Sequence, residues 1–535
     1  MSYIPPNSTV RLIKNCPLSS DYEHTIYFAN SNSQYSYFSS LSGFTLNNQM
    51  YQRVDKGIFK CELTMSNIYD CNYMMFRNSS FENFWFYAFI DKIEYQNNGL
   101  AYVYFTIDVI QTWFIQKLTL GECFVEREHS VSDEIGEHIE SESLSCGEYK
   151  CNFYGELARA DKESYDNVTQ FAIVVAIVDT DNDKGSEGRL YDGVYGGATL
   201  YCYRQGDKEG VNNKINEYVS ANKSDAIVSI YLTPQFLVEP YLDTHEINET
   251  LKGRSLTYEL SAITNDDTLD GYKPKNNKLY TYPYNFLQVD NGSGNAMTLR
   301  YEFFKDLTPR LRWSGTITTP IQLMLRPKYY KSDKVDVLRC ETLTISNFPV
   351  CSWNYDAYQA WCAQSGMQVQ RVVNSAITGV VGGAITGSAF GSIGSGVMAT
   401  YGGVMNTLNT ALDILSKDYQ ASISADTLGG NFSSANANMS QNELGFNVGR
   451  FSVSSNIAKR IDDFFSMYGY SCGRLKVPNI SSRPYWNFVK TANCELSGSA
   501  PNDDITKIKQ IFNNGITFWK SASYMYKYDL DNSPS

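Results

Sequence analysis

Hydrophobic and polar residues alternate over the first 130 positions in a way that is typical of antiparallel β-strands. The aromatic run 84–90 continues into residues 91–95, and after Asn98-Gly99 a second run covers 100–109. Asn-Gly between two such runs is a strong indication of a tight hairpin turn. In the second run, alternate residues fall on opposite faces of a strand. One face carries Val103, Phe105, Ile107 and Val109, and the other carries Tyr102, Tyr104, Thr106 and Asp108. We expect the first face in the core and the second in water or against a neighbouring subunit.

The pattern changes over residues 151–283. Residues 171–178 form a continuous apolar run, as in a strand that is buried on both faces, and residues 226–232 form another. Between them, apolar residues recur at helical spacing from Val211 to Val219. This mixture predicts an inserted α/β domain. Strand patterns then resume at 297–303, 311–317 and 321–325.

Two amphipathic helices are predicted near the C-terminus. The first has an apolar stripe from Ile457 to Tyr468, with Ser454 or Ser455 placed to cap its start and Gly469 to end it. The second runs from about Ile505 to Phe512 and is stopped by Asn514-Gly515. The fold class is therefore mainly β (α+β).

One long segment has no charged residue from Val372 to Leu412, and small residues recur in it at every fourth position. This stripe is Ser375, Gly379, Gly383, Gly387, Gly391, Ser395, Ala399 and Gly403. Small residues at this spacing let helices approach closely inside lipid. The apolar residues of the segment are Ile377, Val380, Val381, Ile385, Phe390, Ile393, Val397 and Val404. We interpret these sixteen residues as a membrane-active loop.

The length of the segment suits two helical legs, 372–390 and 397–415, with a turn between them. Each leg would span about 28 Å, close to the ~30 Å of a hydrocarbon core. A period of four exceeds the helical 3.6, so the stripe rotates by about 40° per step, which favours two short helices over one. The apolar residues would contribute only about −2 to −5 kcal/mol near the bilayer centre. A single copy would insert marginally, whereas several copies together would insert more firmly. A Gly-rich loop or a buried helical hairpin is the alternative interpretation.

Composition and charge favour some classes of function and argue against others. A chain of 535 residues predicts two to four domains, and 14% aromatic residues favour β structure and large interfaces. A net charge of −12 argues against a protein that grips nucleic acid by its phosphates, but suits one that DNA slides past. The 12 cysteines form no CxxC pair, so we expect reduced thiols and no zinc site. The N-terminus has no basic region followed by an apolar one, so we expect no secretory signal.

Motifs of catalysis and metal binding are incomplete. The run 245–249 has Glu249 where a zinc-binding helix needs its second histidine. The run that begins at Asp179 lacks the glycine and the final glutamate of a calcium loop. The acidic stretch 126–142 is interpreted as a solvated connector rather than a set of catalytic carboxylates. We therefore predict no enzyme, no cofactor and no metal site.

The chain resembles the distal tail, or tail-knob, proteins of short-tailed phages of the phi29 type. The resemblance covers most of the chain and is strongest at its ends. It rests on residues 33–38 (SQYSYF), 85–89 (WFYAF), 105–113 (FTIDVIQTW), 127–129 (REH), 468–470 (YGY), 478–479 (PN), 489–491 (VKT), Cys494, 497–498 (SG) and 511–519 (IFNNGITFW).

The resemblance implies β-barrel-like tube domains that assemble into a homohexameric ring at the tail tip. The predicted parts are a first β tube domain (1–150), an inserted α/β outer domain (151–283), a second β tube domain (284–369), an apolar plug or membrane loop (370–442) and a terminal α+β segment that completes the tube (443–535). The uncharged segment corresponds to the family's plug by composition and position, not residue by residue.

The function that the resemblance implies is a conduit for genome ejection. Its loops plug the lumen and then form a pore in the host cytoplasmic membrane. The implied partners are the lower collar or tail tube, a separate wall-degrading enzyme at the tail tip, and viral DNA in passage. The implied location is the distal end of the tail in the virion. Two alternatives stay open: a receptor-binding protein that contacts wall polysaccharide, and a wall hydrolase with a carboxylate pair.

Overall fold

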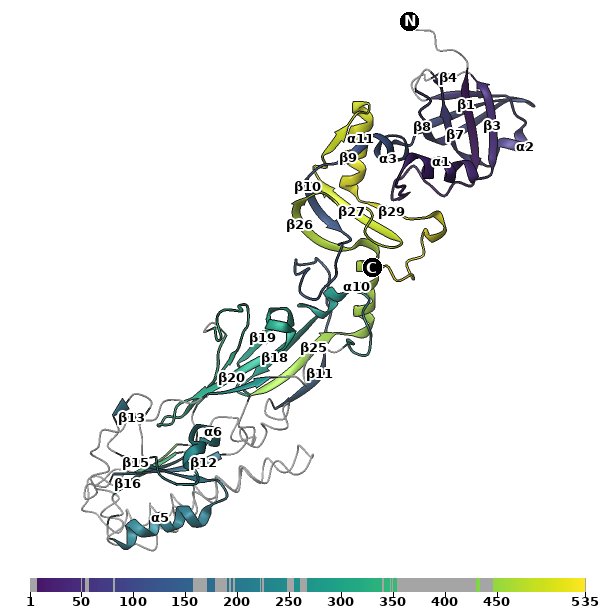
Figure 1. The fold of residues 1–535 in the computed structure, drawn as a ribbon. Coiled ribbons are helices and arrows are strands. Elements are labelled where there is room, and N and C mark those ends of the chain that lie inside the picture. The colour runs from purple at the N-terminus through teal and green to yellow at the C-terminus, as the bar shows by residue number, and fades with distance from the viewer. Residues whose placement is uncertain are drawn as a thin grey trace. The chain divides into compact units, whose positions relative to one another are not determined.

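The computed structural model describes residues 7–49, 51–52, 57–79, 82–156, 171–178, 190–191, 194–195, 198–221, 223, 226–247, 255–259, 267–338, 341–346, 348, 350–353, 430–433 and 446–534. The chain divides into two compact units. The first unit comprises Met1–Gly147, Gly271–Leu279 and Ser455–Ser535, and the second comprises Glu148–Asp270 and Tyr280–Ser454. The fold is mostly β, as predicted (Figure 1). Among the described residues, no helix is long and apolar enough to cross a membrane.

A seven-stranded antiparallel sheet, which curls, forms the N-terminal part of the first unit (Figure 1). Its order is β3-β1-β6-β7-β8-β5-β4. The strands are β1 (Ser8–Lys14), β3 (Gly43–Gln49), β4 (Tyr51–Gln52), β5 (Ile58–Cys61), β6 (Cys71–Arg77), β7 (Phe86–Asn97) and β8 (Leu100–Ile107). Helix α1 (Ser31–Ser40) inserts Phe38 against Tyr73 and Tyr87 on one face of the sheet, and α2 (Met65–Ile68) follows β5. Both faces of this sheet are buried in separate apolar clusters.

The predicted hairpin is confirmed, because Asn97 of β7 pairs with Leu100 of β8 across a two-residue turn. Val103 and Phe105 are buried, whereas Tyr102 and Tyr104 are half-exposed, so the alternation is confirmed as well. The prediction for Asp108 is wrong. The strand ends at Ile107, and Asp108 turns inward to accept hydrogen bonds from the backbone N–H groups of Ile110 and Gln111 at 3.1 Å each. It caps the turn that follows, since a carboxylate satisfies free N–H groups at a helix start.

A second sheet of the first unit combines strands from both ends of the chain. Its order is β2-β29-β27-β10-β26. These strands are β2 (His24–Ile26), β10 (Cys123–Glu128), β26 (Tyr470–Lys476), β27 (Trp486–Ala492) and β29 (Ile516–Trp519); nearby elements are η2 (Ile110–Phe114), α3 (Ile115–Lys117), the pair β9 (Leu118–Leu120) and β28 (Leu496–Gly498), and η11 (Ala522–Tyr524). Strands β2 and β29 are parallel, and the other pairs are antiparallel.

Both predicted C-terminal helices are confirmed. Helix α10 (Ser455–Tyr468) is followed by Gly469 at φ +65°, and α11 (Asn502–Asn514) by Gly515 at φ +98°. Glycine suits these positions because it adopts positive φ without steric cost. A Cβ on Gly469 would also lie 2.1 Å from the backbone oxygen of Glu128.

In the second unit, the described residues form three larger sheets that share one apolar core. The orders are β11-β25-β18-β19, β15-β12-β16-β23-β24 and β17-β20-β21-β22, beside the pair β13-β14. The strands are β11 (Tyr149–Glu156), β12 (Phe171–Ile177), β13 (Leu190–Tyr191), β14 (Val194–Tyr195), β15 (Thr199–Arg204), β16 (Ile227–Pro234), β17 (Ser255–Glu259), β18 (Asn285–Asp290), β19 (Ala296–Leu299), β20 (Arg310–Gly315), β21 (Gln322–Pro327), β22 (Leu343–Ser346), β23 (Val350–Trp353), β24 (Gly430–Ser433) and β25 (Asn447–Val453).

Among the described residues, the helices of this unit are short except for α5. They are α5 (Lys208–Ser220), α6 (Gln235–Val238), η6 (Glu239–Tyr241), η9 (Tyr301–Phe303) and η10 (Lys305–Leu307), while η8 (Asn277–Tyr280) begins in the first unit. The predicted buried strand is confirmed over Phe171–Ile177, all of which is buried, whereas Val178 lies beyond the strand and is exposed. Helix α5 confirms the predicted helix. The strand predicted at 297–303 is only partly right, because β19 ends at Leu299 and η9 follows.

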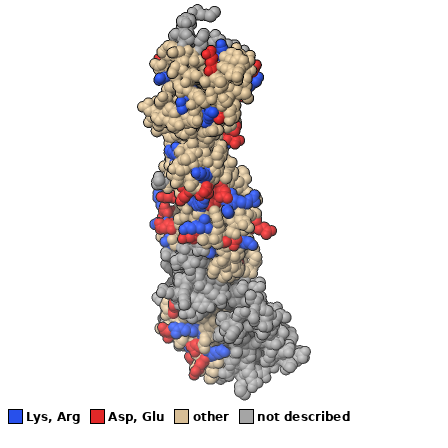
Figure 2. Space-filling view, turned by 90° about the vertical axis from the view of Figure 1, so that its right-hand side faces the viewer, with Lys and Arg blue, Asp and Glu red and all other residues tan. Residues whose placement is uncertain are grey.

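Charged side chains of both signs are interspersed on the face shown in Figure 2, with wide uncharged areas between them. No single-sign patch dominates the described part of this face.

Candidate functional site

The sixteen residues predicted to form the membrane-active loop lie between Ser375 and Val404, outside the described residues. Of the predicted segment 370–442, the structure describes Gly430–Ser433 alone. The calcium-like run at Asp179 also lies outside the described residues. The structure instead defines the base of the uncharged segment, where the chain enters and leaves it.

Strands β23 and β24, which flank residues 354–429, are hydrogen-bonded neighbours in one sheet. Their antiparallel register pairs Trp353 with Gly430 and Val350 with Ser433. Opposed residues of an antiparallel pair lie about 4.5–5.5 Å apart at their Cα atoms. The segment therefore begins and ends at the same place on the sheet. The backbone hydrogen bonds between β23 and β24 hold its two ends together, whatever path the residues between them take.

The sheet that carries this base is well anchored. Strand β23 pairs on its other side with β16, where Val350 lies opposite Tyr231 and Cys351 opposite Ile230. Val350 and Cys351 pack against the apolar core, and burial raises the pKa of the Cys351 thiol to about 12. Tyr231 also donates a hydrogen bond from its hydroxyl to the backbone oxygen of Ile317 at 2.9 Å. Strand β23 is thus tied to the second unit's core, and close-packed interiors resist displacement.

A separate polar network in the first unit holds residues 271–279, which we call the strap. Asp462 of α10 is 1% exposed and accepts four hydrogen bonds from it. The donors are the Tyr272 hydroxyl (2.7 Å), the Lys275 backbone N–H (2.8 Å), and the backbone N–H (3.0 Å) and side-chain amide (2.7 Å) of Asn276. Hydrogen bonds to a buried carboxylate are stronger than neutral ones. The strap is therefore held in place by hydrogen bonds to the Asp462 side chain rather than by a β ladder.

The acidic stretch 126–142 contributes to the same network, so its interpretation as a solvated connector is partly wrong. Asp133 accepts hydrogen bonds from the Tyr470 hydroxyl at 2.6 Å and from the Asn277 backbone N–H at 3.1 Å. The Glu142 side chain is 0% exposed and forms ion pairs with Lys278, at 2.6 Å, and with Arg127. A carboxylate can be buried only when cations or donors replace its water. These acidic residues therefore act as structural anchors.

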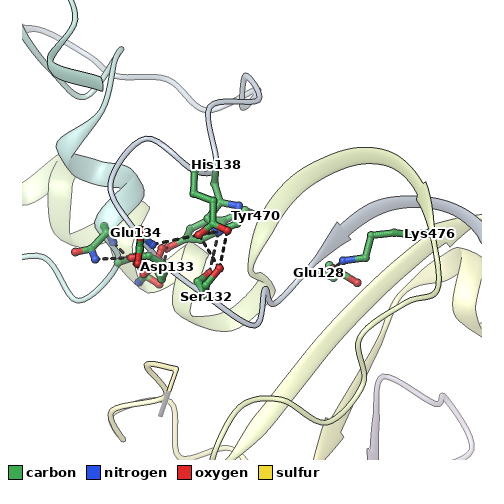
Figure 3. A network of polar contacts seen from close by, with 10 residues as sticks. Glu128, Ser132, Asp133, Glu134, His138, Tyr470 and Lys476 are labelled. Carbon is green, nitrogen blue, oxygen red and sulfur yellow. Dashed lines mark hydrogen bonds and ion pairs between the residues drawn. The ribbon is translucent and has the colours of Figure 1, made fainter. Parts of the chain in front are cut away.

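Figure 3 shows how the residues around Asp133 lie. Ser132, Asp133 and His138 gather beside Tyr470, whereas Glu128 and Lys476 form an ion pair on the neighbouring strands. The His138 ring packs on Tyr470 with ring centroids 4.8 Å apart and bonds to the backbone oxygen of Ser132 at 2.9 Å. All these contacts join parts of the first unit to one another, so these residues stabilise the fold.

His129 shows why the motif 127–129 matters to the fold. Its Nδ1 accepts from the Phe488 N–H at 2.8 Å, so its Nε2 carries the proton and donates to the Ser466 oxygen at 3.0 Å. Burial, helped by the nearby Arg483 charge, lowers the pKa of His129 to about 3. The Asn479 backbone N–H donates to the Glu128 carboxylate at 2.8 Å, and its side-chain amide donates to the backbone oxygen of His129 at 2.9 Å. Residues that carry the family resemblance at the two ends of the sequence thus meet in space. In the described part of the chain, no cluster of side chains suits a metal ion.

Two family models match the chain. Residues 6–118 match the N-terminus of the caudoviral major tail protein. Residues 248–533 match the C-terminal domain of the tail knob protein gp9 of Bacillus phage phi29. Together with the curled N-terminal sheet, these matches define a tail protein of a tailed bacteriophage. The chain belongs to the family of phi29-type tail knob proteins, structural components of the tail tip.

Full-length relatives agree with this assignment. The chain is 25% identical to the tail knob protein gp9 of Bacillus phage phi29, over 99% of this chain and 100% of the relative. It is 26% identical to the corresponding protein of Bacillus phage PZA over the same shares. The fold matches the structure of the bacteriophage C1 tail knob protein gp12 with a TM-score of 0.62 and 14% identity, over 97% and 98% of the two chains. These matches confirm the resemblance to tail-knob proteins that the sequence indicates. Homology to structural tail knob proteins implies a structural rather than an enzymatic role.

Proposed function

We propose that six copies of this chain form a conduit at the tail tip, through which the genome leaves the virion. In this proposal the loops 370–442 fill the lumen before ejection. They then leave it and insert into the host cytoplasmic membrane as a pore. The small residues from Ser375 to Gly403 pack the inserted helices, and the apolar residues from Ile377 to Val404 face the lipid.

The observation that carries this proposal is the pairing of Trp353 with Gly430 at the base of the segment. A loop whose two ends meet at one point of a rigid sheet can change its position without any change in that sheet. A segment whose two ends were far apart would have its movement limited by the distance between its anchor points. The paired base thus supports a loop that has two alternative locations.

Composition supports the same proposal. The segment is uncharged from Val372 to Leu412 but only weakly apolar, so it tolerates an aqueous lumen. Insertion of one copy is worth about −2 to −5 kcal/mol from its apolar residues. Six copies that insert together add these contributions and gain helix packing through their glycines. A net charge of −12 suits a conduit that DNA passes without binding.

The paired base also permits a clean deletion. We would replace residues 354–429 by Asn-Gly, which joins Trp353 to Gly430 as a two-residue hairpin and leaves the ladder intact. The unaltered protein should make dye-filled liposomes leak, and the hairpin variant should not. A matched control keeps the length of the segment but replaces it by a Gly/Ser-rich sequence, which should also be inactive. Equal leakage from all three proteins would refute the membrane function.

Ring formation is tested separately by negative-stain microscopy. The proposal predicts six-fold rings for the unaltered chain and for the hairpin variant, because the deletion leaves both described units whole. Binding to purified cell walls without any leakage would favour a receptor-binding protein. A loss of turbidity in a cell-wall suspension would favour a hydrolase.

A further inference from the structure

Two arginines face each other on the outer side of a sheet in the second unit. Arg312 of β20 lies directly opposite Arg326 of β21 in the antiparallel register. The residues that flank them in sequence, including Trp313 and Leu325, are buried in the core, so both arginines lie on the opposite, outer face. Like charges at directly opposed positions destabilise a sheet. An arrangement of this kind calls for a compensating negative charge.

Among the described residues, Asp336 supplies one negative charge beside Arg312. Asp336 forms ion pairs with Arg312 at 3.4 Å and with Lys328 at 3.5 Å, and it is shared between them. Arg326 donates to the Thr342 hydroxyl at 3.1 Å and contacts the Met324 sulfur at 3.6 Å. Within the described part of the chain, no carboxylate lies at ion-pair distance from Arg326. Among the described carboxylates, Asp336 is therefore paired with Arg312 and Lys328, and none is paired with Arg326.

A cavity of about 210 Å³ lies between the two arginines. It is lined by Arg312, Ser314, Arg326 and Val337. Guanidinium groups bind phosphate with paired N–H donors in fixed geometry, and a serine hydroxyl adds one further donor. The volume is below the roughly 300–1,000 Å³ of typical pockets for drug-sized ligands, so the ligand is small.

We propose that this cavity binds the phosphate group of a small molecule between Arg312 and Arg326, with Ser314 as a third donor. The bound oxyanion removes the repulsion between the two strands and supplies the partner that Arg326 lacks among the described carboxylates. A duplex nucleic acid does not fit this description, because its binding needs a row of phosphate contacts on a basic surface, and the chain is acidic.

The test follows thermal unfolding of the full-length protein in increasing inorganic phosphate, with sodium chloride added to hold the ionic strength constant. We expect the midpoint to rise with phosphate, since a ligand that binds only the folded state stabilises it. Arg326→Gln should bind phosphate about 10- to 100-fold more weakly, the effect of losing a hydrogen bond to a charged group. Without phosphate its midpoint should equal or exceed that of the unaltered protein, because the repulsion is gone, and this shows that the variant folds.

The matched control is Arg204→Gln, which removes the same charge from an exposed ion pair with Asp243 in the same unit. It should respond to phosphate like the unaltered protein. An equal response of Arg326→Gln, or no response of the unaltered protein, would overturn the proposal. Glycerol phosphate as a second probe distinguishes an ester from the free ion, and tighter binding of either supports the site. Displacement of phosphate by a DNA duplex would overturn the assignment of a small ligand.

Discussion

The strongest test of the strap is the substitution Asp462→Asn, which keeps the size of the side chain and replaces one carboxylate oxygen by an NH₂ group. In the fold, one oxygen faces the Lys275 N–H and the other faces the Asn276 N–H. Either orientation of the new amide therefore places its NH₂ group against a backbone donor. At least one hydrogen bond is lost, and a buried N–H is left without an acceptor.

The magnitude follows from these contacts. A hydrogen bond to a charged group contributes about 1.5–3 kcal/mol, and an unsatisfied buried donor costs about 1–3 kcal/mol. We therefore expect the strap to be destabilised by about 3 kcal/mol, at the lower end of the combined range. At 1.4 kcal/mol per factor of ten, its opening becomes about 100-fold more frequent. Because the strap belongs to no β ladder, it should open locally while the rest of the first unit stays folded.

Hydrogen–deuterium exchange with mass spectrometry measures this opening in a peptide that covers residues 272–279. Asp463→Asn is the control, since Asp463 is the next residue of α10 and its side chain is exposed. The control should leave the exchange of this peptide unchanged. If Asp462→Asn changed the exchange of this peptide by less than threefold, the Asp462 carboxylate would not be what holds the strap.

Three further predictions concern single residues of the first unit. Burial raises the pKa of Asp108 from 3.8 to about 6, so the folded state binds this proton more tightly than the unfolded chain does. The stability that this group contributes is present below about pH 4 and is lost, by about 3 kcal/mol, as the pH rises through 6. The free energy of unfolding, measured in urea at pH 4 and at pH 7, should therefore fall less for Asp108→Asn than for the unaltered protein. Lys278→Met removes a cation from a buried ion pair and should cost about 3 kcal/mol, seen as a lower melting midpoint. Gly469→Ala should destabilise more than Gly473→Ala: both glycines have positive φ, but a Cβ meets the Glu128 backbone at the first position and open space at the second, and differential scanning fluorimetry compares them.

Local sequence patterns predicted many elements correctly. The Asn98-Gly99 turn, the buried strand β12 and the helix that ends at Gly469 each depend on neighbours within a few positions. Period-two or period-3.6 spacing of apolar residues is enough to specify such elements. The same patterns failed at Asp108, where the strand ended two residues earlier than expected and the side chain turned inward.

The polar anchors could not be predicted in this way. Asp462 and its partners on the strap are separated by about 190 positions, and Glu142 is separated from Lys278 by 136. An aspartate or glutamate in a polar stretch has the same sequence pattern whether it is solvated or buried against a cation. Only the arrangement of distant segments decides between the two.

Sequence alone was enough to recognise the mainly β fold class, the helices that end at a glycine, the uncharged segment and the family resemblance. Each of these depends on local spacing or on ordered matches along the chain. Folding brings Trp353 beside Gly430, places Arg312 opposite Arg326, and buries Glu142 of the acidic stretch against Lys278. These contacts depend on strand register and on the packing of residues far apart in sequence. They form only when the whole chain folds, so no local pattern specifies them.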